Sequence, residues 1–266
     1  MFVILSGSSG VGKNTIINYI QSKNPNFIFM PTFTTRAKRE GEVEGNPFFF
    51  ISKEEFQEKI KNNEFIEYAF IHNNYYGSSF KVFEETVKAD NIVIKDIDVE
   101  GAQNFTSKLG NQTKLLKIFL TAPKKELKNR LIGRKEKEIK LRLKRFDYEQ
   151  KQKNKFDYII LNKNLESTSK IVMELCKLKE ADFLPSKPVN KISKRKIKKY
   201  AEKLLTGKIL KPIKIFLNSG SAQIVKGEEK FIASLITKKP VAKEIVVNLK
   251  KSAKAKKGWI DAFLGK

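Results

Sequence analysis

The feature that most constrains this chain is a loop near its N-terminus, Gly7-Ser8-Ser9-Gly10-Val11-Gly12-Lys13-Asn14-Thr15. A continuous apolar run, residues 2–5, precedes the loop and predicts a buried strand, and helical spacing follows from Thr15 to Ile20. In that context the glycines let backbone N–H groups surround phosphate oxygens, and the positive end of the helix adds to the attraction. We therefore expect the loop to bind nucleotide phosphates, with Lys13 at the β- and γ-phosphates. A glycine turn without a ligand is the structural alternative.

One position departs from the usual phosphate-binding loop, because Asn14 stands where a serine or threonine hydroxyl normally approaches Mg²⁺. An amide oxygen also coordinates hard cations, so we expect an altered metal site rather than none. The apolar strand 92–97 carries Asp96 near its end, and that carboxylate is the second candidate for the metal. Asp96 and Asp98 alternate, so regular strand geometry would point them to opposite faces.

Strand-like and helix-like segments alternate up to about residue 180. The expected strands are 2–5, 26–30, 48–51, 92–97, 115–120 and 156–161. The expected helices are 15–20, 53–61, one starting near Pro123, 136–152 and 167–179. This alternation predicts an α/β fold with a mostly parallel sheet and helices on both faces.

The last third of the chain differs in composition. The whole sequence has 54 Lys and Arg against 29 Asp and Glu, a net charge of +25, and residues 181–266 alone hold 22 basic and 6 acidic residues. We expect a linker at 181–190, marked by two prolines, and then a small basic C-terminal region, 191–266. Its expected elements are a basic amphipathic helix over 191–205 and strands at 213–217, 222–225, 231–236 and 245–249. Such a region favours nucleic acid or another polyanion, while lysine-driven solubility is the alternative.

Cysteine and histidine content excludes two kinds of site. Cys176 is the only cysteine, so no intramolecular disulfide forms, which fits a reducing compartment. His72 is the only histidine and has no partner at metal-ligand spacing, so we expect a loop residue rather than a zinc ligand. No apolar run approaches the ~18 residues of a membrane span, and no leader precedes the first strand, so we expect a cytoplasmic protein.

Several motifs in order resemble those of guanylate kinases. They are Thr34-Thr35-Arg36-Ala37-Lys38-Arg39-Glu40-Gly41-Glu42-Val43-Glu44-Gly45, Asn63–Tyr68, Asn74–Ser78, Asp96–Gly101 and Arg130–Arg134. The resemblance implies a P-loop NTPase-type domain over residues 1–180, with a GMP-binding segment at about 32–80 and a lid at about 124–150. It also implies phosphoryl transfer from ATP to GMP with Mg²⁺ as cofactor. It says nothing about residues 181–266.

The resemblance further implies the residues that hold GMP: Thr32, Arg36, Arg39, Glu42, Glu67, Tyr76, Ser78, Asp96 and Asp98. Their chemistry agrees, because arginine forks suit phosphate and a Glu67 carboxylate suits the adjacent N1–H and N2–H₂ donors of guanine. Glu42 is expected to hold the arginine loop. A solvated basic loop is the structural alternative for the two arginines. Phe48 replaces a family tyrosine whose hydroxyl touches the GMP phosphate, so GMP affinity is expected to fall unless neighbouring residues compensate.

The ATP side is implied in the same way. Arg134 and Arg142 match the lid arginines that would stabilise the transferring phosphate, with Arg145 as an alternative to Arg142. Arg130 and Asn162 resemble residues near adenine. Together, Lys13, Arg36, Arg134 and Arg142 form the expected catalytic set. Asn14 and Phe48 also leave open a second hypothesis, a guanylate-kinase-like binding module without catalysis.

Overall fold

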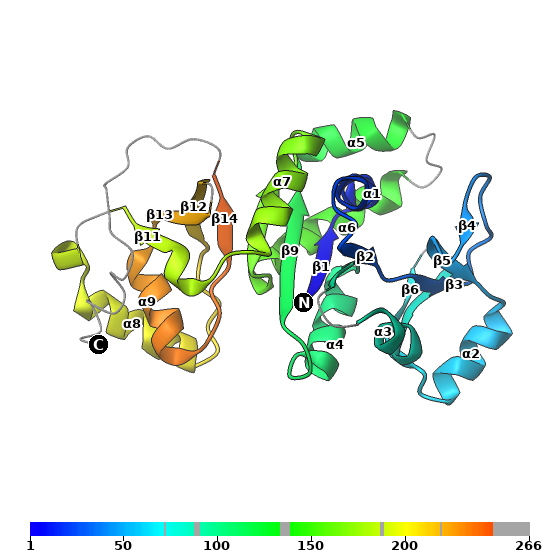
Figure 1. Ribbon diagram of the computed structural model, residues 1–266, viewed down its shortest axis with the longest axis horizontal. Coiled ribbons are helices and arrows are strands. Elements are labelled where there is room, and N and C mark those ends of the chain that lie inside the picture. The colour runs from blue at the N-terminus through cyan, green and yellow to red at the C-terminus, as the bar shows by residue number, and fades with distance from the viewer. Residues whose placement is uncertain (72, 88–90, 134–138, 187–188, 219, 247–266) are drawn as a thin grey trace. The chain divides into compact units, whose positions relative to one another are not determined.

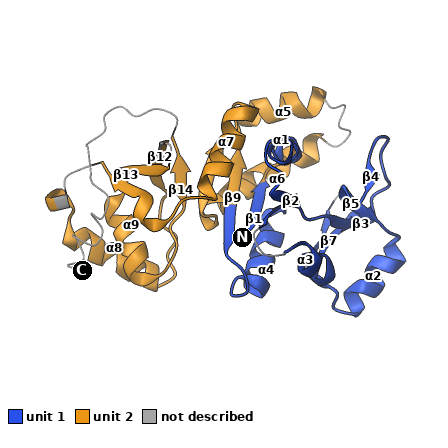
Figure 2. Ribbon diagram, in the orientation of Figure 1, with its two compact units in different colours: residues 1–6, 12–117 blue, residues 7–11, 118–266 orange. Residues whose placement is uncertain are grey.

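The computed structural model describes residues 1–71, 73–87, 91–133, 139–186, 189–218 and 220–246. It contains two compact units: residues 1–6 with 12–117, and residues 7–11 with 118–266 (Figures 1 and 2). Both units contain parallel strands connected through helices, and antiparallel pairs are a minority. The predicted α/β fold with a mostly parallel sheet is confirmed.

Three parallel strands form the core of the first unit in the order β2-β8-β1. They are β1 (Phe2–Gly7), β2 (Phe27–Phe29) and β8 (Ile92–Asp96). Every residue of β1 is buried, which is why an apolar run without polar alternation forms a strand here. β1 leads into α1 (Lys13–Lys23) and β8 into α4 (Val99–Leu109). Phe105 of α4 stacks on Phe2 of β1 with ring centroids 4.7 Å apart, so this contact fixes α4 against the sheet.

A second, mixed sheet of the same unit carries residues 32–80. Its order is β4 (Val43–Glu44), β5 (Pro47–Phe50), β3 (Thr32–Thr34), β7 (Asn74–Ser79) and β6 (Phe65–Ile71). Two helices accompany it, α2 (Lys53–Lys61) and α3 (Phe80–Thr86). Phe56 of α2 stacks on Phe65 and Tyr75, at 4.4 and 5.0 Å between ring centroids, and fixes the helix against the sheet.

The second unit is built on β9 and β10. Its elements up to residue 175 are β9 (Leu115–Thr121, of which Ile118 onward belongs to this unit), α5 (Lys124–Gly133), α6 (Ile139–Gln152), the 3₁₀ turn η1 (Lys153–Lys155), β10 (Tyr158–Leu161) and α7 (Leu165–Leu175). β9 and β10 pair in parallel, with Tyr158 opposite Ile118. Cys176 is buried directly after α7, as expected for an apolar helix face.

The chain after residue 179 continues the sheet of the second unit. Its elements are η2 (Glu180–Asp182), β11 (Phe183–Pro185), η3 (Val189–Lys191), α8 (Lys194–Leu205), β12 (Ile213–Asn218), β13 (Ser221–Lys226), α9 (Glu228–Thr237) and β14 (Lys243–Ile245). The strand order from β10 is β10-β14-β12-β13-β11, and Lys243 of β14 lies opposite Tyr158 of β10. β11 therefore lies inside the segment predicted to be a linker, and β14 connects the added strands to β10.

The prediction of a strand at 231–236 is wrong, because these residues form part of α9. Gly227 caps this helix with φ +110°, and the acidic side chains of Glu228 and Glu229 occupy its first turn. A six-residue apolar run does not distinguish a buried helix from a buried strand, and the helical signals lie just before it.

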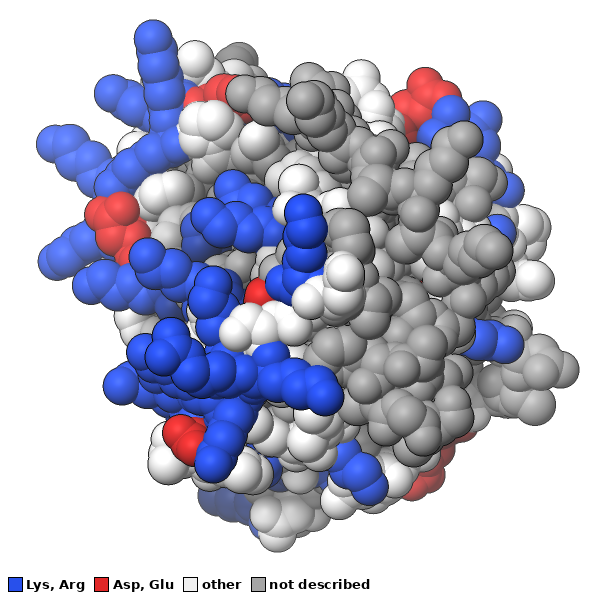
Figure 3. Space-filling model, turned by 90° about the vertical axis from the view of Figure 1, so that its left-hand side faces the viewer, with Lys and Arg blue, Asp and Glu red and all other residues white. Residues whose placement is uncertain are grey.

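Basic side chains dominate the surface of α8. Ile197 and Leu204 are buried, whereas the exposed positions include Lys194, Arg195, Lys196, Lys198 and Lys199. Figure 3 shows a face of the molecule on which Lys and Arg side chains crowd together with few Asp or Glu among them. Within the described residues, no helix is long and apolar enough to cross a membrane.

Candidate nucleotide-binding site

The predicted phosphate loop turns sharply between β1 and α1. Gly7, Gly10 and Gly12 have φ angles of +140°, +83° and +98°. A Cβ atom at Gly7 would lie 2.3 Å from the carbonyl oxygen of Leu120, so only glycine fits there. Gly12 is the N-cap residue of α1 and has no side chain, which leaves the capping position open for an anion.

Two side chains from later in the chain hold this loop by one carbonyl group. Asn162 Nδ2 donates to the carbonyl oxygen of Val11 at 2.7 Å, and Arg130 Nη1 donates to the same atom at 3.3 Å. Asn162 Oδ1 accepts from the Thr168 hydroxyl at 2.9 Å, so both ends of this amide are engaged. Arg130 and Asn162 thus position the loop, and their contact with adenine stays a prediction.

The structure separates the two arginines that the sequence left as alternatives on α6. Arg142 Nη1 donates to the hydroxyl of Ser9 in the phosphate loop at 2.7 Å. Arg145 instead pairs with Glu149 one helical turn away, with Nε and Oε1 3.4 Å apart. The geometry therefore favours Arg142 as the arginine directed at the phosphates. Arg134 lies outside the described residues, as does His72.

On the acceptor side, an arginine–carboxylate pair organises the loop between β3 and β4. Arg36 Nη2 donates to both carboxylate oxygens of Glu42, at 2.7 and 2.9 Å, and the Arg39 backbone N–H donates to Glu42 Oε2 at 2.8 Å. Burial alone would raise the pKa of Glu42, but these hydrogen bonds and the charges of both arginines hold it below its ordinary value. Glu42 fixes Arg36, as its predicted role requires, while the Arg39 side chain is exposed.

Aromatic rings of β5 support the same arginine. The Arg36 guanidinium lies over the rings of Phe48 and Phe50, 5.2 and 5.4 Å from their centroids. The Tyr76 ring meets Phe48 edge-on at 6.0 Å. Phe48 therefore contacts Arg36 and Tyr76, two of the residues predicted to bind the acceptor phosphate, although it lacks a hydroxyl of its own.

A buried polar cluster lies where the base of the acceptor is expected. Thr32, Glu67 and Ser78 are at most 7% exposed, and Ser78 donates its hydroxyl hydrogen to Glu67 Oε1. Burial raises the pKa of Glu67, while Lys95 and the Ser78 hydrogen bond oppose the shift and Asp98 and Asp96 add to it. The three residues lie on three different strands, β3, β6 and β7, so they come together only when the sheet forms.

Asp96 and Asp98 occupy different structural positions. Asp96 ends β8, opposite Leu5 of β1, whereas Asp98 is the N-cap of α4 and accepts from the Gly101 N–H at 2.7 Å. The expectation based on two residues in one regular strand therefore does not apply, because the strand ends between them. A Cβ atom at Gly101 would lie 2.7 Å from Glu67 Oε2, so any larger residue there would displace the buried carboxylate.

The residues predicted to hold a metal fit a cation that keeps other ligands. The described residues contain no group of three or more His, Cys, Asp or Glu side chains arranged for a metal. Mg²⁺ commonly uses one or two protein ligands, with substrate phosphates and water completing its octahedron. An Asn14 amide in the first turn of α1 and an Asp96 carboxylate at the end of β8 supply that small set of oxygen donors. Asn14 and Glu42 also line a common pocket of about 290 Å³.

Comparison with known proteins agrees with this arrangement. The guanylate kinase family model matches residues 1–179. This chain belongs to the guanylate kinase family. A guanylate kinase from Helicobacter pylori (strain ATCC 700392 / 26695) is 40% identical over 179 residues, which cover 66% of this chain and 85% of the relative.

Two further relatives support the assignment. A guanylate kinase from Prochlorococcus marinus (strain MIT 9312) is 40% identical over 177 residues, covering 65% of this chain and 95% of the relative. The crystal structure of guanylate kinase from Anaplasma phagocytophilum matches with a TM-score of 0.55 and 30% identity, over 66% of this chain and 83% of that chain. The family match ends at the start of the C-terminal region.

Two residues of this guanylate kinase domain were missed by the sequence analysis. Gly101 was noted only as part of a motif, although its lack of a side chain makes room for Glu67. Lys95 is completely buried, and its burial lowers its pKa to about 8, against the opposing charges of Glu67 and Asp96. A lysine within an otherwise apolar strand was the available signal, because such a strand buries its side chains on both faces.

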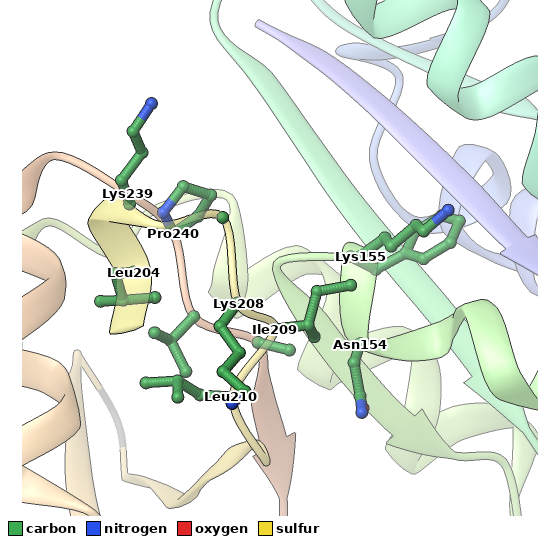
Figure 4. A pocket seen from close by; sticks show the side chains of 12 residues that line it. Asn154, Lys155, Leu204, Lys208, Ile209, Leu210, Lys239 and Pro240 are labelled. Atoms are coloured by element: carbon green, nitrogen blue, oxygen red, sulfur yellow. The ribbon is translucent and has the colours of Figure 1, made fainter. Parts of the chain in front are cut away.

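A pocket outside these residues lies where the C-terminal region meets η1. It has a volume of about 210 Å³ and is lined by the apolar side chains of Leu204, Ile209 and Leu210, with Asn154 and Lys155 on the η1 side (Figure 4). None of its lining residues belongs to the predicted site. It is therefore separate from the residues that the guanylate kinase motifs place around the nucleotides.

Proposed function

We propose that this protein transfers the γ-phosphoryl group of ATP to GMP, giving ADP and GDP, with Mg²⁺ as cofactor. The observation that carries the proposal is the buried Glu67 carboxylate, which accepts from Ser78 and lies beside Gly101. Guanine presents two adjacent donors, N1–H and N2–H₂, that such a carboxylate can accept together, and adenine lacks this pair. A buried acceptor left without a donor is costly, so the cluster favours GMP.

On the ATP side, the phosphate loop supplies backbone donors and Lys13 supplies a mobile positive charge. Arg142 is anchored on Ser9 and would stabilise the charge of the transferring phosphoryl group, together with Arg134. Little covalent chemistry is required of the protein in phosphoryl transfer, so positioning and charge stabilisation provide most of the catalysis. A lid over 124–150 would also exclude water, which would otherwise hydrolyse ATP.

On the GMP side, Arg36, Arg39 and Tyr76 would hold the phosphate. Glu42 keeps the Arg36 fork oriented, which lowers the entropy lost when phosphate binds. Thr32, Ser78 and Glu67 would meet the base, with Asp98 close to them. No general base is needed, because the acceptor is already a phosphate oxygen anion.

When bound, Mg²⁺ would supply positive charge that offsets the charge of the ATP phosphates. Asn14 and Asp96 are the residues of this chain that would hold it, directly or through water. Asn14 offers a neutral amide oxygen where the usual loop has a hydroxyl, so the site keeps an oxygen donor. The bounds of the domains, 1–180, 181–190 and 191–266, and a cytoplasmic location complete the proposal.

A nucleotide-specificity assay tests the reaction. ADP release by the purified full chain is measured with ATP, Mg²⁺ and each of GMP, AMP, UMP and CMP. We expect turnover that depends on GMP and is at least about a hundredfold lower in kcat/KM with AMP, as expected for a site that reads base donors. The absence of GMP-dependent turnover would contradict the proposal. Calorimetric titration of GMP and ATP would then decide for a binding module without catalysis, a hypothesis that no observation in the structure favours.

The exposed face of α8 supports a second, additional function, the binding of nucleic acid or another polyanion. Lys194, Arg195, Lys196, Lys198 and Lys199 are exposed in its first turns, while Ile197 between them is buried. The exposed side of these turns therefore carries positive charge with no apolar side chain among it. Contacts with a phosphate backbone need only such a positive surface.

Fluorescence anisotropy with labelled RNA and DNA oligonucleotides tests this second function. We expect binding at low ionic strength that weakens steeply with salt, and a clear loss in the charge-reversal variant Lys198→Glu/Lys199→Glu. The matched control is Lys53→Glu/Lys61→Glu on α2, which makes the same charge change on another exposed helix. Equal binding by both variants, or no binding at low salt, would rule out α8 as the binding surface.

A further inference from the structure

Lys95 is completely buried, and the proposed reaction assigns no role to its charge. Its Nζ atom donates to the Thr32 hydroxyl oxygen at 2.6 Å, to the Pro31 carbonyl at 3.1 Å and to the Met30 carbonyl at 3.3 Å. Three acceptors match the three N–H donors of an ammonium group. Burying an amine is costly unless its hydrogen bonds are satisfied, so the chain around residue 31 is shaped to hold Lys95.

The consequence falls on Thr32, because the two backbone carbonyls fix the position of Nζ independently of any ligand. A lysine ammonium has no lone pair, so it cannot accept the hydroxyl hydrogen of Thr32. Thr32 Oγ1 must act as the acceptor in this pair, and its single hydrogen is left to donate to another group. In the buried cluster with Glu67 and Ser78, that group would be an acceptor atom of the bound base.

We infer that Lys95 is a positioning residue that holds the Thr32 hydroxyl as a hydrogen-bond donor, so that the acceptor site selects a 6-oxopurine over a 6-aminopurine. The inference rests on the proposed function, since it requires the base of the acceptor nucleotide to lie at Thr32. A 6-oxo group accepts the Thr32 hydrogen, whereas a 6-amino group turns its own N–H toward that donor. Two facing donors cost binding energy, so the arrangement rejects adenine as well as accepting guanine.

Lys95 and Glu67 would then recognise different parts of the base. Thr32, oriented by Lys95, recognises the 6-oxo group, which GMP and IMP share. Glu67 recognises N1–H and the 2-amino group, and only GMP carries the latter. Loss of the Thr32 hydroxyl should therefore weaken GMP and IMP by the same factor, while loss of the Glu67 charge should change their ratio.

The test compares kcat/KM for GMP, IMP and 6-thioguanosine 5′-monophosphate, whose sulfur is a weak acceptor at the 6-position. For Lys95→Met and Thr32→Val we expect the KM for GMP to rise by about two- to tenfold, the range of one neutral hydrogen bond, with the KM for ATP unchanged. The preference for GMP over its 6-thio analogue should shrink toward one in both variants. The double variant should lose no more than Lys95→Met alone, because the Thr32 substitution removes an interaction that Lys95→Met has already removed.

Two controls separate this role from a structural one. Lys95→Gln keeps an N–H₂ donor and should recover part of the 6-oxo preference. Lys108→Met removes an exposed lysine that donates to the Phe65 carbonyl at 3.2 Å and should leave the preference unchanged. Thermal melting monitors folding, and if Lys95→Met does not fold, Lys95→Gln and Thr32→Val decide.

Three outcomes would overturn the inference while leaving the proposed reaction intact. They are an unchanged preference for GMP over the 6-thio analogue in the Lys95 or Thr32 variants, effects that multiply in the double variant, and a GMP-to-IMP ratio that changes in Thr32→Val. A wild-type protein that does not phosphorylate GMP would instead contradict the proposed function itself.

Discussion

The two nucleotide-binding regions of this chain are built from different parts of the polypeptide. The phosphate loop consists of backbone: three glycines with positive φ, and a carbonyl of Val11 held by Asn162 and Arg130. The acceptor region consists of side chains that orient other side chains, as Glu42 does with Arg36 and Ser78 with Glu67. Backbone donors bind any phosphate, whereas paired side chains distinguish one ligand from another.

This difference indicates which side-chain substitutions each region tolerates. In the loop, the Asn14 side chain can differ from the family pattern if, as proposed, the backbone N–H groups make most of the phosphate contacts. In the acceptor region, Glu67 is buried with Lys95 and Ser78, so a change in one side chain alters the charge or hydrogen bonding of its neighbours. Substitutions in the loop should therefore affect the rate, and those in the acceptor region should affect the choice of nucleotide.

The largest effect should follow from Lys13→Ala. Lys13 is the one side chain in the loop expected to move its charge with the transferring phosphoryl group, and the backbone cannot replace it. We expect kcat to fall by roughly 10³–10⁵, the range known for a cation that stabilises this transition state, with GMP binding by calorimetry little changed. Lys23→Ala, in the last turn of the same helix, is the control. Substantial remaining turnover would refute the assignment of the loop.

Arg142→Ala should have the next largest effect. Its Nη1 atom reaches Ser9 at 2.7 Å, so the guanidinium is held beside the phosphate loop. We expect kcat to fall by roughly 10²–10³, as for the loss of one preorganised donor, and the selectivity for GMP over AMP to remain. Arg145→Ala is the matched control, because that arginine is paired with Glu149 on the same helix. An equal fall in kcat for both variants would show that Arg142 and Arg145 do not differ in their effect on catalysis.

Much of the fold could be predicted because local patterns coincide with burial. The run at residues 2–5 has no polar alternation and is buried throughout in β1, and the helix predicted at 53–61 is α2. Helices α3 and α4 and strands β3, β4, β6 and β7 were not predicted. The error at 231–236 arose where the pattern was too short. The pairing of β14 with β10 joins Lys243 to Tyr158, and no local signal encodes a contact across so many residues.

The site residues also divide into those that were predicted to meet and those that were not. The Arg36–Glu42 pair lies within one short motif, so the family resemblance was enough to predict that Glu42 holds the arginine loop. The Lys95–Thr32 hydrogen bond connects two residues 63 positions apart, and the apolar strand around Lys95 indicates its burial but not its partner. Arg142 could be separated from Arg145 only by seeing which of them reaches Ser9.

Glu67→Gln should change the choice of nucleotide more than the rate. The substitution keeps the shape of the side chain but replaces a charged acceptor with an amide that offers one acceptor and one donor group. We expect kcat/KM for GMP to fall by about 10- to 100-fold, the value of a hydrogen bond to a charged group, and the KM for ATP to stay the same. Glu64→Gln, on a residue paired with Lys59 at 3.2 Å, is the control. A proportional loss with GMP and IMP would show that Glu67 does not recognise the 2-amino group.

Phe48→Tyr should give the smallest effect, and in the direction of improvement. The Phe48 ring already lies over Arg36 and against Tyr76, so a para hydroxyl would be added beside residues proposed to hold the acceptor phosphate. Because those two residues already neutralise part of the phosphate charge, we expect the KM for GMP to fall by about two- to tenfold, less than a full charged hydrogen bond provides.

Phe49→Tyr adds the same hydroxyl on the opposite face of β5, where Phe49 packs against Phe33, and should not improve the KM for GMP. Steady-state kinetics with GMP varied at saturating ATP measures both variants. A KM that falls equally in both would mean that the gain does not come from the phosphate. If the KM for GMP does not fall in Phe48→Tyr, Arg36 and Tyr76 already bind the phosphate as well as a tyrosine hydroxyl would allow. The acceptor region would then compensate for its missing hydroxyl, as we expect the phosphate loop to do at Asn14.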